Sequence, residues 1–73
     1  MDTRRVGRRI KGYRKLKGYT QAQFAKEIGV PLTVLGAAER GVRKPPESLL
    51  DEIAAKLEIE KEEMIMQQGE KED

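Results

Sequence analysis

The sequence contains no cysteine and no histidine among its 73 residues. Without cysteine, neither a disulfide framework nor a thiolate metal site can hold the chain together. Without histidine, the commonest general base and the commonest metal ligand are both missing. We therefore expect no cofactor, no metal ion and no catalytic residue, and the composition does not favour an enzyme.

Long apolar runs are also missing. No segment approaches the ~20 apolar residues of a membrane span, and no apolar signal segment follows the N-terminus. Together with the lack of cysteine, this favours a cytoplasmic protein that has no membrane partner. A chain this short forms one domain that buries only about 60% of its unfolded surface, so its core must come from aliphatic packing, helped by dimerisation.

Charge is distributed unevenly along the chain. Residues 1–46 contain twelve Lys or Arg and three acids, whereas residues 47–73 contain three Lys and ten acids. The first part therefore carries a net charge of +9 and the second −7, within an overall +2. A small domain with one basic end favours a polyanionic partner, although two solvated faces are the plainer interpretation.

The first apolar pattern, from Arg5 to Lys17, predicts an amphipathic helix with a basic outer face. The stripe consists of Val6, Ile10 and Tyr13, completed by Leu16 or by the aliphatic stem of Lys17. Gly18 stands where a glycine commonly ends a helix.

A second helix is predicted by its start and stop signals. Thr20 is a good N-cap, and Gln23 three residues later completes a capping box. Tyr19 and Phe24 fall at the two positions of a hydrophobic staple. Gly29 ends this helix within about ten residues, which is short.

The third predicted helix runs from Pro31, at the first helical position, to Arg40, with Gly41 after its end. Leu35 and Ala38 can face the core. A basic loop, residues 42–46, follows and ends in two prolines.

The last third predicts two more helices. One opens at Glu47 or Ser48, and its apolar stripe comprises Leu49, Leu50, Ile53, Ala54 and Leu57. A short fifth helix spans about Lys61 to Gln67. The sequence thus predicts an all-α domain over residues 1–67 and a charged, disordered tail over residues 68–73.

Two short helices joined by a glycine turn, with a basic loop behind them, are typical of a helix-turn-helix. The geometry needs small or aliphatic residues where the helices cross, and Ala25, Gly29 and Leu35 occupy those places. On these grounds the sequence favours DNA binding over a plain packing device.

Two segments, Arg14–Val30 and Ala38–Pro45, resemble the Cro/C1-type (xenobiotic response element) helix-turn-helix family. The Thr-Gln start, the Ala-(three residues)-Gly turn, the Glu-Arg-Gly end and the trailing proline keep the family's spacing, and the likeness extends over about Val6 to Ile65. The resemblance implies a five-helix, lambda-repressor-like domain whose helices 2 and 3 form the helix-turn-helix. It also implies a transcriptional regulator, expected to be a repressor, that binds double-stranded DNA.

A homodimer is part of what the resemblance implies, with two half-sites about one helical turn apart. We expect the contact at the fifth helix and the C-terminal region. Their apolar residues exceed what one short helix needs to bury, namely Ile59, Met64, Ile65 and Met66.

Site residues carried over from the family have three roles. Gln21 resembles the phosphate-clamping glutamine, while Arg14 and Glu39 occupy the positions of a partly buried ion pair. Arg43 and Lys44 resemble loop residues that meet phosphates. The full set expected at DNA is Thr20, Gln21, Pro31, Leu32, Thr33, Gly36, Ala37, Arg40, Arg43 and Lys44.

The third helix departs from the family, because only Thr33 among its base-reading positions offers a hydrogen-bonding side chain. Pro31 stands where the family has a Ser or Thr cap. Gly36 in mid-helix costs about 1 kcal/mol relative to alanine, which close approach of a backbone or a phosphate could offset.

Three accounts fit this bare face. In the first, binding rests on phosphates, with weak preference from Thr33, thymine methyl contacts and groove shape. In the second, a basic N-terminal arm reads part of an unusual site. In the third account Leu32, Val34, Gly36 and Ala37 form an apolar patch for a protein partner, so that the domain is an interaction module without sequence-specific DNA binding.

Overall fold

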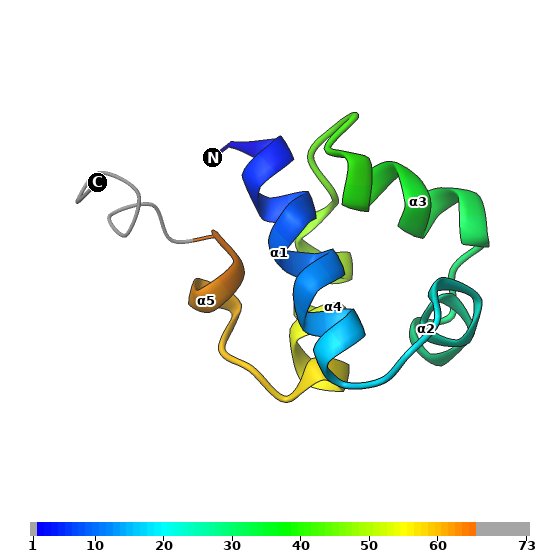
Figure 1. Ribbon diagram of the computed structural model, residues 1–73. Helices are drawn as coiled ribbons and strands as arrows, with labels where there is room; N and C mark the ends of the chain where they lie inside the picture. Colours follow the sequence, from blue (N-terminus) through cyan, green and yellow to red (C-terminus); the bar gives the residue numbers. More distant parts are fainter. Residues whose placement is uncertain (1, 66–73) are drawn as a thin grey trace.

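The computed structural model describes residues 2–65, and every regular element among them is a helix. The helices are α1 (Thr3–Leu16), α2 (Gln21–Ile28), α3 (Leu32–Arg40), α4 (Glu47–Leu57) and α5 (Lys61–Ile65) (Figure 1). The all-α prediction and its five helices are thereby confirmed. The expected extension of the fifth helix to Gln67, Met66 with it, and the tail over residues 68–73 lie outside the described residues.

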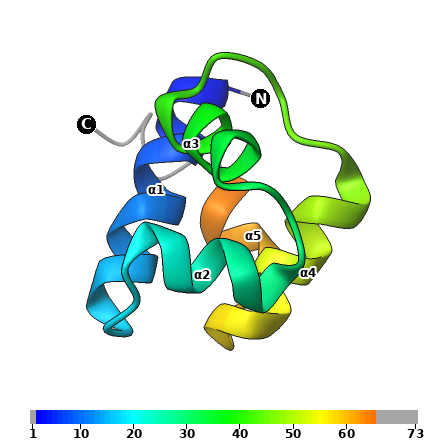
Figure 2. The same ribbon diagram turned by 90° about the vertical axis from the view of Figure 1, so that its right-hand side faces the viewer.

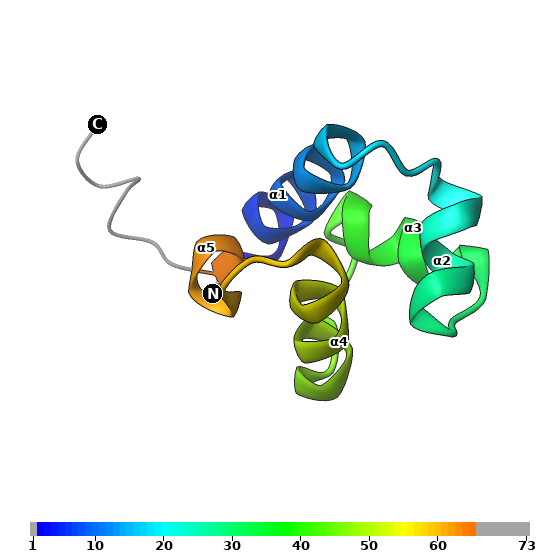
Figure 3. The same ribbon diagram turned by 90° about the horizontal axis from the view of Figure 1, so that it is seen from below.

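Helices α1 and α4 lie between the two ends of the molecule (Figure 3). Helices α2 and α3 lie at one end and α5 at the other, as seen from the front and from below (Figures 1 and 3). Figure 2 looks onto the helix-turn-helix end, where α2 and α3 lie in front of α5. The unit between Thr20 and Gly41 is therefore presented on one end of the domain.

The core draws on all five helices. Its fully buried large side chains are Ile10, Phe24, Leu35, Leu50, Ile53, Leu57 and Met64. On α1 the buried stripe runs through Val6, Ile10 and Arg14, a spacing of four residues that keeps one helix face inward. The predicted completion by Leu16 or Lys17 was wrong. Both side chains are exposed, Leu16 at 77%. Leu16, two positions beyond Arg14, points about 200° away around the helix, and Lys17 is the C-cap beyond the end of α1.

Helix ends follow the sequence signals closely. The Gln23 backbone N–H donates to Thr20 Oγ1 at 3.1 Å, and the Thr20 N–H donates to Gln23 Oε1 at 2.9 Å, which completes the predicted capping box. The Tyr19 and Phe24 rings contact each other with centroids 5.1 Å apart. Pro31 is the N-cap of α3 rather than its first helical residue, with an extended backbone at ψ 150°.

Helix α1 approaches α3 at backbone distance because two glycines carry no Cβ. A Cβ on Gly7 would lie 2.5 Å from the carbonyl oxygens of Ala38 and Glu39. A Cβ on Gly41 would lie 2.5 Å from the Cα of Arg4, and Gly41 also has φ +72°, which L side chains rarely adopt. These contacts set the distance between α1 and the helix-turn-helix.

Helix α5 is fixed by polar contacts with α1 and α4. Lys61 pairs with Glu47 and, at 3.0 Å, with Asp51, and both carboxylates raise the pKa of Lys61 above its ordinary value. The Tyr13 hydroxyl donates to Glu63 Oε1 at 3.0 Å, which raises the Tyr13 pKa.

The apolar residues of α5 are largely used within the domain. Met64, expected at the dimer contact, is 0% exposed, and the partly buried Ile59 and Ile65 pack against the core. Met64 is therefore a core residue, and of the expected contact residues within the described chain only Ile59 and Ile65 keep exposed surface.

No helix within residues 2–65 is long and apolar enough to cross a membrane. The same residues contain no group of three or more acidic side chains placed to hold a metal ion.

Candidate nucleic-acid interface

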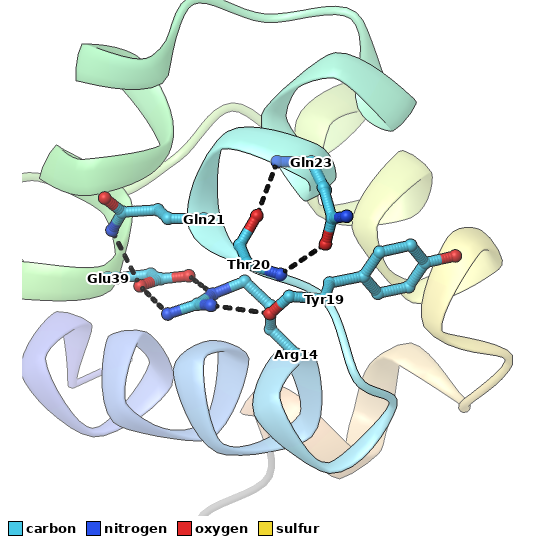
Figure 4. A network of polar contacts seen from close by, with 6 residues as sticks. All are labelled: Arg14, Tyr19, Thr20, Gln21, Gln23 and Glu39. Atoms are coloured by element: carbon cyan, nitrogen blue, oxygen red, sulfur yellow. Dashed lines mark hydrogen bonds and ion pairs between the residues drawn. The ribbon is translucent and has the colours of Figure 1, made fainter.

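A buried ion pair connects α1 to α3 beneath the helix-turn-helix (Figure 4). Arg14 Nε donates to Glu39 Oε2 at 2.6 Å and Arg14 Nη2 to Glu39 Oε1 at 3.2 Å. The third guanidinium nitrogen, Nη1, donates to the Tyr19 carbonyl at 2.9 Å. The two side chains are only 6% and 3% exposed, so the bidentate geometry compensates for the loss of water around both charges.

Gln21 belongs to the same polar network. Gln21 is the first residue of α2 and directly follows the N-cap residue Thr20. Its Nε2 donates to Glu39 Oε1 at 3.0 Å (Figure 4). The backbone N–H groups of Gln21 and Ala22 have no acceptor within the described chain, because they precede the first intrahelical bond. The start of α2 thus presents two free donors and a side chain held in position by a buried carboxylate.

The outward face of α3 is mostly apolar. Leu32, Thr33 and Val34 are exposed, and Ala37 is partly buried. Leu32 and Val34 are 48% and 39% exposed, respectively. Among these four residues only Thr33 carries a hydrogen-bonding side chain, which agrees with the sequence analysis.

Gly36 differs from its predicted place on the open face of α3. It is buried, and the atoms above it are the Arg40 guanidinium and the Gln21 amide. A Cβ at Gly36 would lie 3.1 Å from Arg40 Nη1 and 3.9 Å from Gln21 Nε2. The predicted apolar patch therefore excludes Gly36, because two polar side chains cover this part of the helix.

The loop after α3 exposes its basic residues. Val42, Arg43 and Lys44 are exposed, whereas Pro45 is buried and fixes the end of the loop. A groove of about 600 Å³ runs between this loop, α3 and the start of α4. Its walls include Thr33, Val34, Ala37, Val42, Arg43 and Leu49. The exposed apolar surface thus lies beside α3 and not on it alone.

The expected N-terminal arm is instead part of α1. Asp2 Oδ1 accepts from the backbone N–H groups of Arg4 and Arg5, at 3.1 and 3.2 Å, and the bond from Arg5 contributes most to lowering the Asp2 pKa. Thr3 Oγ1 donates to the Gly41 carbonyl at 3.1 Å. Arg4 and Arg5 thus lie in the capped first turn of α1. Residues 2–65 therefore contain no extended N-terminal arm of the kind that the second account requires.

Two relationships were missing from the sequence analysis, namely Gln21 with Glu39 and Arg40 with Gly36. The second had a signal, because residues four apart share one helix face and a glycine there leaves room for a long side chain. The first had none, since Gln21 and Glu39 lie on different helices and only the packing of α2 against α3 brings them together. The other expected site residues, Thr20, Pro31, Arg43 and Lys44, are all exposed.

Comparison with known proteins gives consistent results. The profile of a helix-turn-helix family matches residues 10–64, well over half of the chain. The HTH-type transcriptional regulator YazB of Bacillus subtilis (strain 168) is 44% identical over 64 residues, which are 88% of this chain and 93% of YazB.

Solved structures show the same arrangement of helices. The restriction-modification controller protein C.AhdI from Aeromonas hydrophila superposes with a TM-score of 0.82 at 30% identity, over 88% of this chain and 97% of the other. SinR, a master regulator for biofilm formation crystallised in complex with DNA, superposes with a TM-score of 0.77 at 33% identity, over 82% of this chain and 97% of the other. Both similarities extend over nearly the whole described domain.

Proposed function

The chain belongs to the Cro/C1-type helix-turn-helix family of DNA-binding transcriptional regulators, and we propose that it docks on duplex DNA with α3 and the start of α2. Members of this family are not enzymes. Docking on phosphates dominates in this proposal, and base reading is weak. The regulator is proposed to act as a repressor in the cytoplasm.

The position of Gln21 is the observation that carries this proposal. Its side chain and the free N–H groups of Gln21 and Ala22 lie at the positive end of the α2 dipole, where an anion is favoured. The hydrogen bond to Glu39 fixes the amide before any ligand arrives, which lowers the entropy lost on binding. Thr20, exposed beside it, has a hydroxyl hydrogen that can donate to the same phosphate.

Further phosphate contacts are proposed for the exposed Arg43 and Lys44 and for Arg40 at the end of α3. Sequence preference rests on a few groups of α3. Thr33 can hydrogen-bond a base edge, while Leu32 and Ala37 can meet thymine methyl groups, and the exposed Pro31 packs against the sugar-phosphate backbone.

A homodimer is proposed on the family's two-half-site pattern, with the contact at α5 and the C-terminal region. Ile59 and Ile65 remain partly exposed there, whereas Met64 is unavailable. Sedimentation equilibrium tests this proposal. A molecular mass that rises with concentration supports it, and a concentration-independent monomer, alone and on a two-half-site duplex, contradicts it.

The groove beside α3 favours a second candidate, a protein-interaction module that retains the helix-turn-helix shape. Selection from a pool of random duplexes separates the two. A regulator enriches a short motif, and its affinity falls as salt rises because phosphate contacts release counterions. No enrichment together with flat salt dependence would favour the interaction module.

A further inference from the structure

Helix α3 contains a glycine four residues before an arginine, and the glycine leaves space that the arginine side chain occupies. Gly36 and Arg40 share one face of α3, and Arg40 Nη1 lies 3.1 Å from where a Gly36 Cβ would be. An Ala at position 36 would press against the guanidinium. Because Gly36 has no side chain, the Arg40 guanidinium has room to lie back along α3, over Gly36, instead of extending past the end of the helix.

This position over Gly36 places the Arg40 guanidinium near the start of α2. Gln21 Nε2 lies 3.9 Å from the same Cβ position, so the guanidinium and the amide converge above Gly36. These two groups carry hydrogen-bond donors from different helices. The amide is oriented by the buried Glu39 carboxylate (Figure 4).

Among the described residues, Arg40 has no anionic partner of its own. Within residues 2–65 no hydrogen bond or ion pair engages its guanidinium, and the nearest acid along the chain, Glu39, is already bound by Arg14 and Gln21. An exposed guanidinium that lacks a counter-charge among the described residues is suited to an external anion that accepts two or more hydrogen bonds.

We propose that Gly36, Arg40 and Gln21 form one composite clamp for a DNA backbone phosphate, in which Gly36 is the positioning element and Arg40 supplies the charge. This inference rests on the proposed function and assigns Gly36, which looked like a gap in the reading face, to the phosphate contact. A phosphate is favoured over a guanine edge because the clamp adjoins the free N–H groups of Gln21 and Ala22, which also attract anions.

The test compares the wild type with single and double variants on a fluorescent duplex of mixed sequence, by anisotropy, between about 50 and 200 mM salt. Arg40→Gln is expected to weaken binding about tenfold and to reduce the slope of log K against log salt by about 0.9. Gly36→Ala is expected to weaken binding about threefold while raising the midpoint of thermal unfolding by about 4–8 °C, since alanine favours a helix interior. The double variant should bind no more weakly than Arg40→Gln.

Gly12→Ala is the matched control, because Gly12 is a helical glycine with open space where its Cβ would lie. It should raise the midpoint similarly and leave affinity unchanged. Wild-type affinity and slope in Gly36→Ala, or losses that add in the double variant, would overturn the clamp. So would an Arg40→Gln protein with altered sequence preference and an unchanged slope. If Gln21→Ala still weakens binding in those cases, only the clamp fails; a wild-type protein with no salt-dependent affinity for duplexes refutes the proposed function itself.

Discussion

Gln21 Nε2 lies 3.0 Å from Glu39 Oε1, the same oxygen that accepts from Arg14 Nη2 at 3.2 Å. One buried carboxylate oxygen thus accepts hydrogen bonds both from Arg14 of the buried ion pair and from Gln21, the residue of the proposed phosphate contact. The ion pair is therefore more than a link between α1 and α3, since its carboxylate also positions the Gln21 side chain that is proposed to meet a DNA phosphate.

Replacing one member of the ion pair should destabilise the fold strongly. Arg14→Met leaves Glu39 buried without its partner, which is expected to cost about 3–5 kcal/mol of unfolding free energy. Urea denaturation measures this loss. The double variant Arg14→Met/Glu39→Met should recover most of the stability, because two apolar groups replace two buried charges. It should nevertheless bind DNA more weakly than the wild type, since Gln21 has lost its anchor. Full affinity in the refolded double variant would refute the anchoring role.

Gly7→Ala should destabilise the domain although it lies within a helix. Its Cβ would lie 2.5 Å from the carbonyl oxygens of Ala38 and Glu39, so α1 and α3 must move apart, at a cost of about 1–3 kcal/mol. Gly12→Ala in the same helix meets no neighbour and should stabilise by about 0.5–1 kcal/mol. Opposite shifts in the thermal midpoint support the close approach of α1 to α3. Stabilisation by both variants would contradict it.

Stability should depend on pH through the cap of α1. The pKa of Asp2 is lowered in the folded state, chiefly by the backbone N–H of Arg5, so its contribution is present above the unfolded-state value of about 4. That contribution is lost as pH falls through the folded-state pKa. The stability difference between wild type and Asp2→Ala should therefore be constant near neutral pH and shrink in acid. An unchanged difference down to about pH 2 would mean that the carboxylate charge is irrelevant to the cap.

Base preference and phosphate binding should separate by residue. Thr33→Ala is expected to alter the motif enriched from random duplexes, because among Leu32, Thr33, Val34 and Ala37 only Thr33 can hydrogen-bond a base through its side chain. Arg43→Ala should weaken all duplexes alike, since a phosphate contact carries no sequence information. Sequencing of selected pools for each variant distinguishes the two effects. A shifted motif with Arg43→Ala, or an unshifted one with Thr33→Ala, would contradict this division.

Much of the fold could be predicted because the signals that start and end each helix are local in sequence. The Thr20 capping box, the staple of Tyr19 on Phe24 and the turn glycines Gly29 and Gly41 each act within a few residues, so the sequence contains the whole cause. The start of α1 was misplaced for a similar local reason. Asp2 is a good N-cap residue, yet the run of arginines after it resembled a free arm.

The site was harder to predict, since its geometry depends on contacts between helices. In a helix rich in Arg and Lys, the family resemblance placed Arg14 in a partly buried ion pair, but it did not show that Gln21 shares the same carboxylate. Likewise, a role for Gly36 becomes visible only in the structure, where the Arg40 and Gln21 side chains converge above it. The burial of Met64 depends on how α5 packs against α1 and α4, which no periodicity over five residues can fix.

The most direct test of the account is the salt dependence of duplex binding by wild type and Gln21→Ala, measured side by side. We predict that log K of the wild type falls linearly with log salt, by about 0.9 for each phosphate neutralised. Because Gln21 is uncharged, its loss should displace this line to about tenfold weaker binding without changing its slope. A flat wild-type line, or two superimposed lines, would contradict docking through a phosphate at the start of α2.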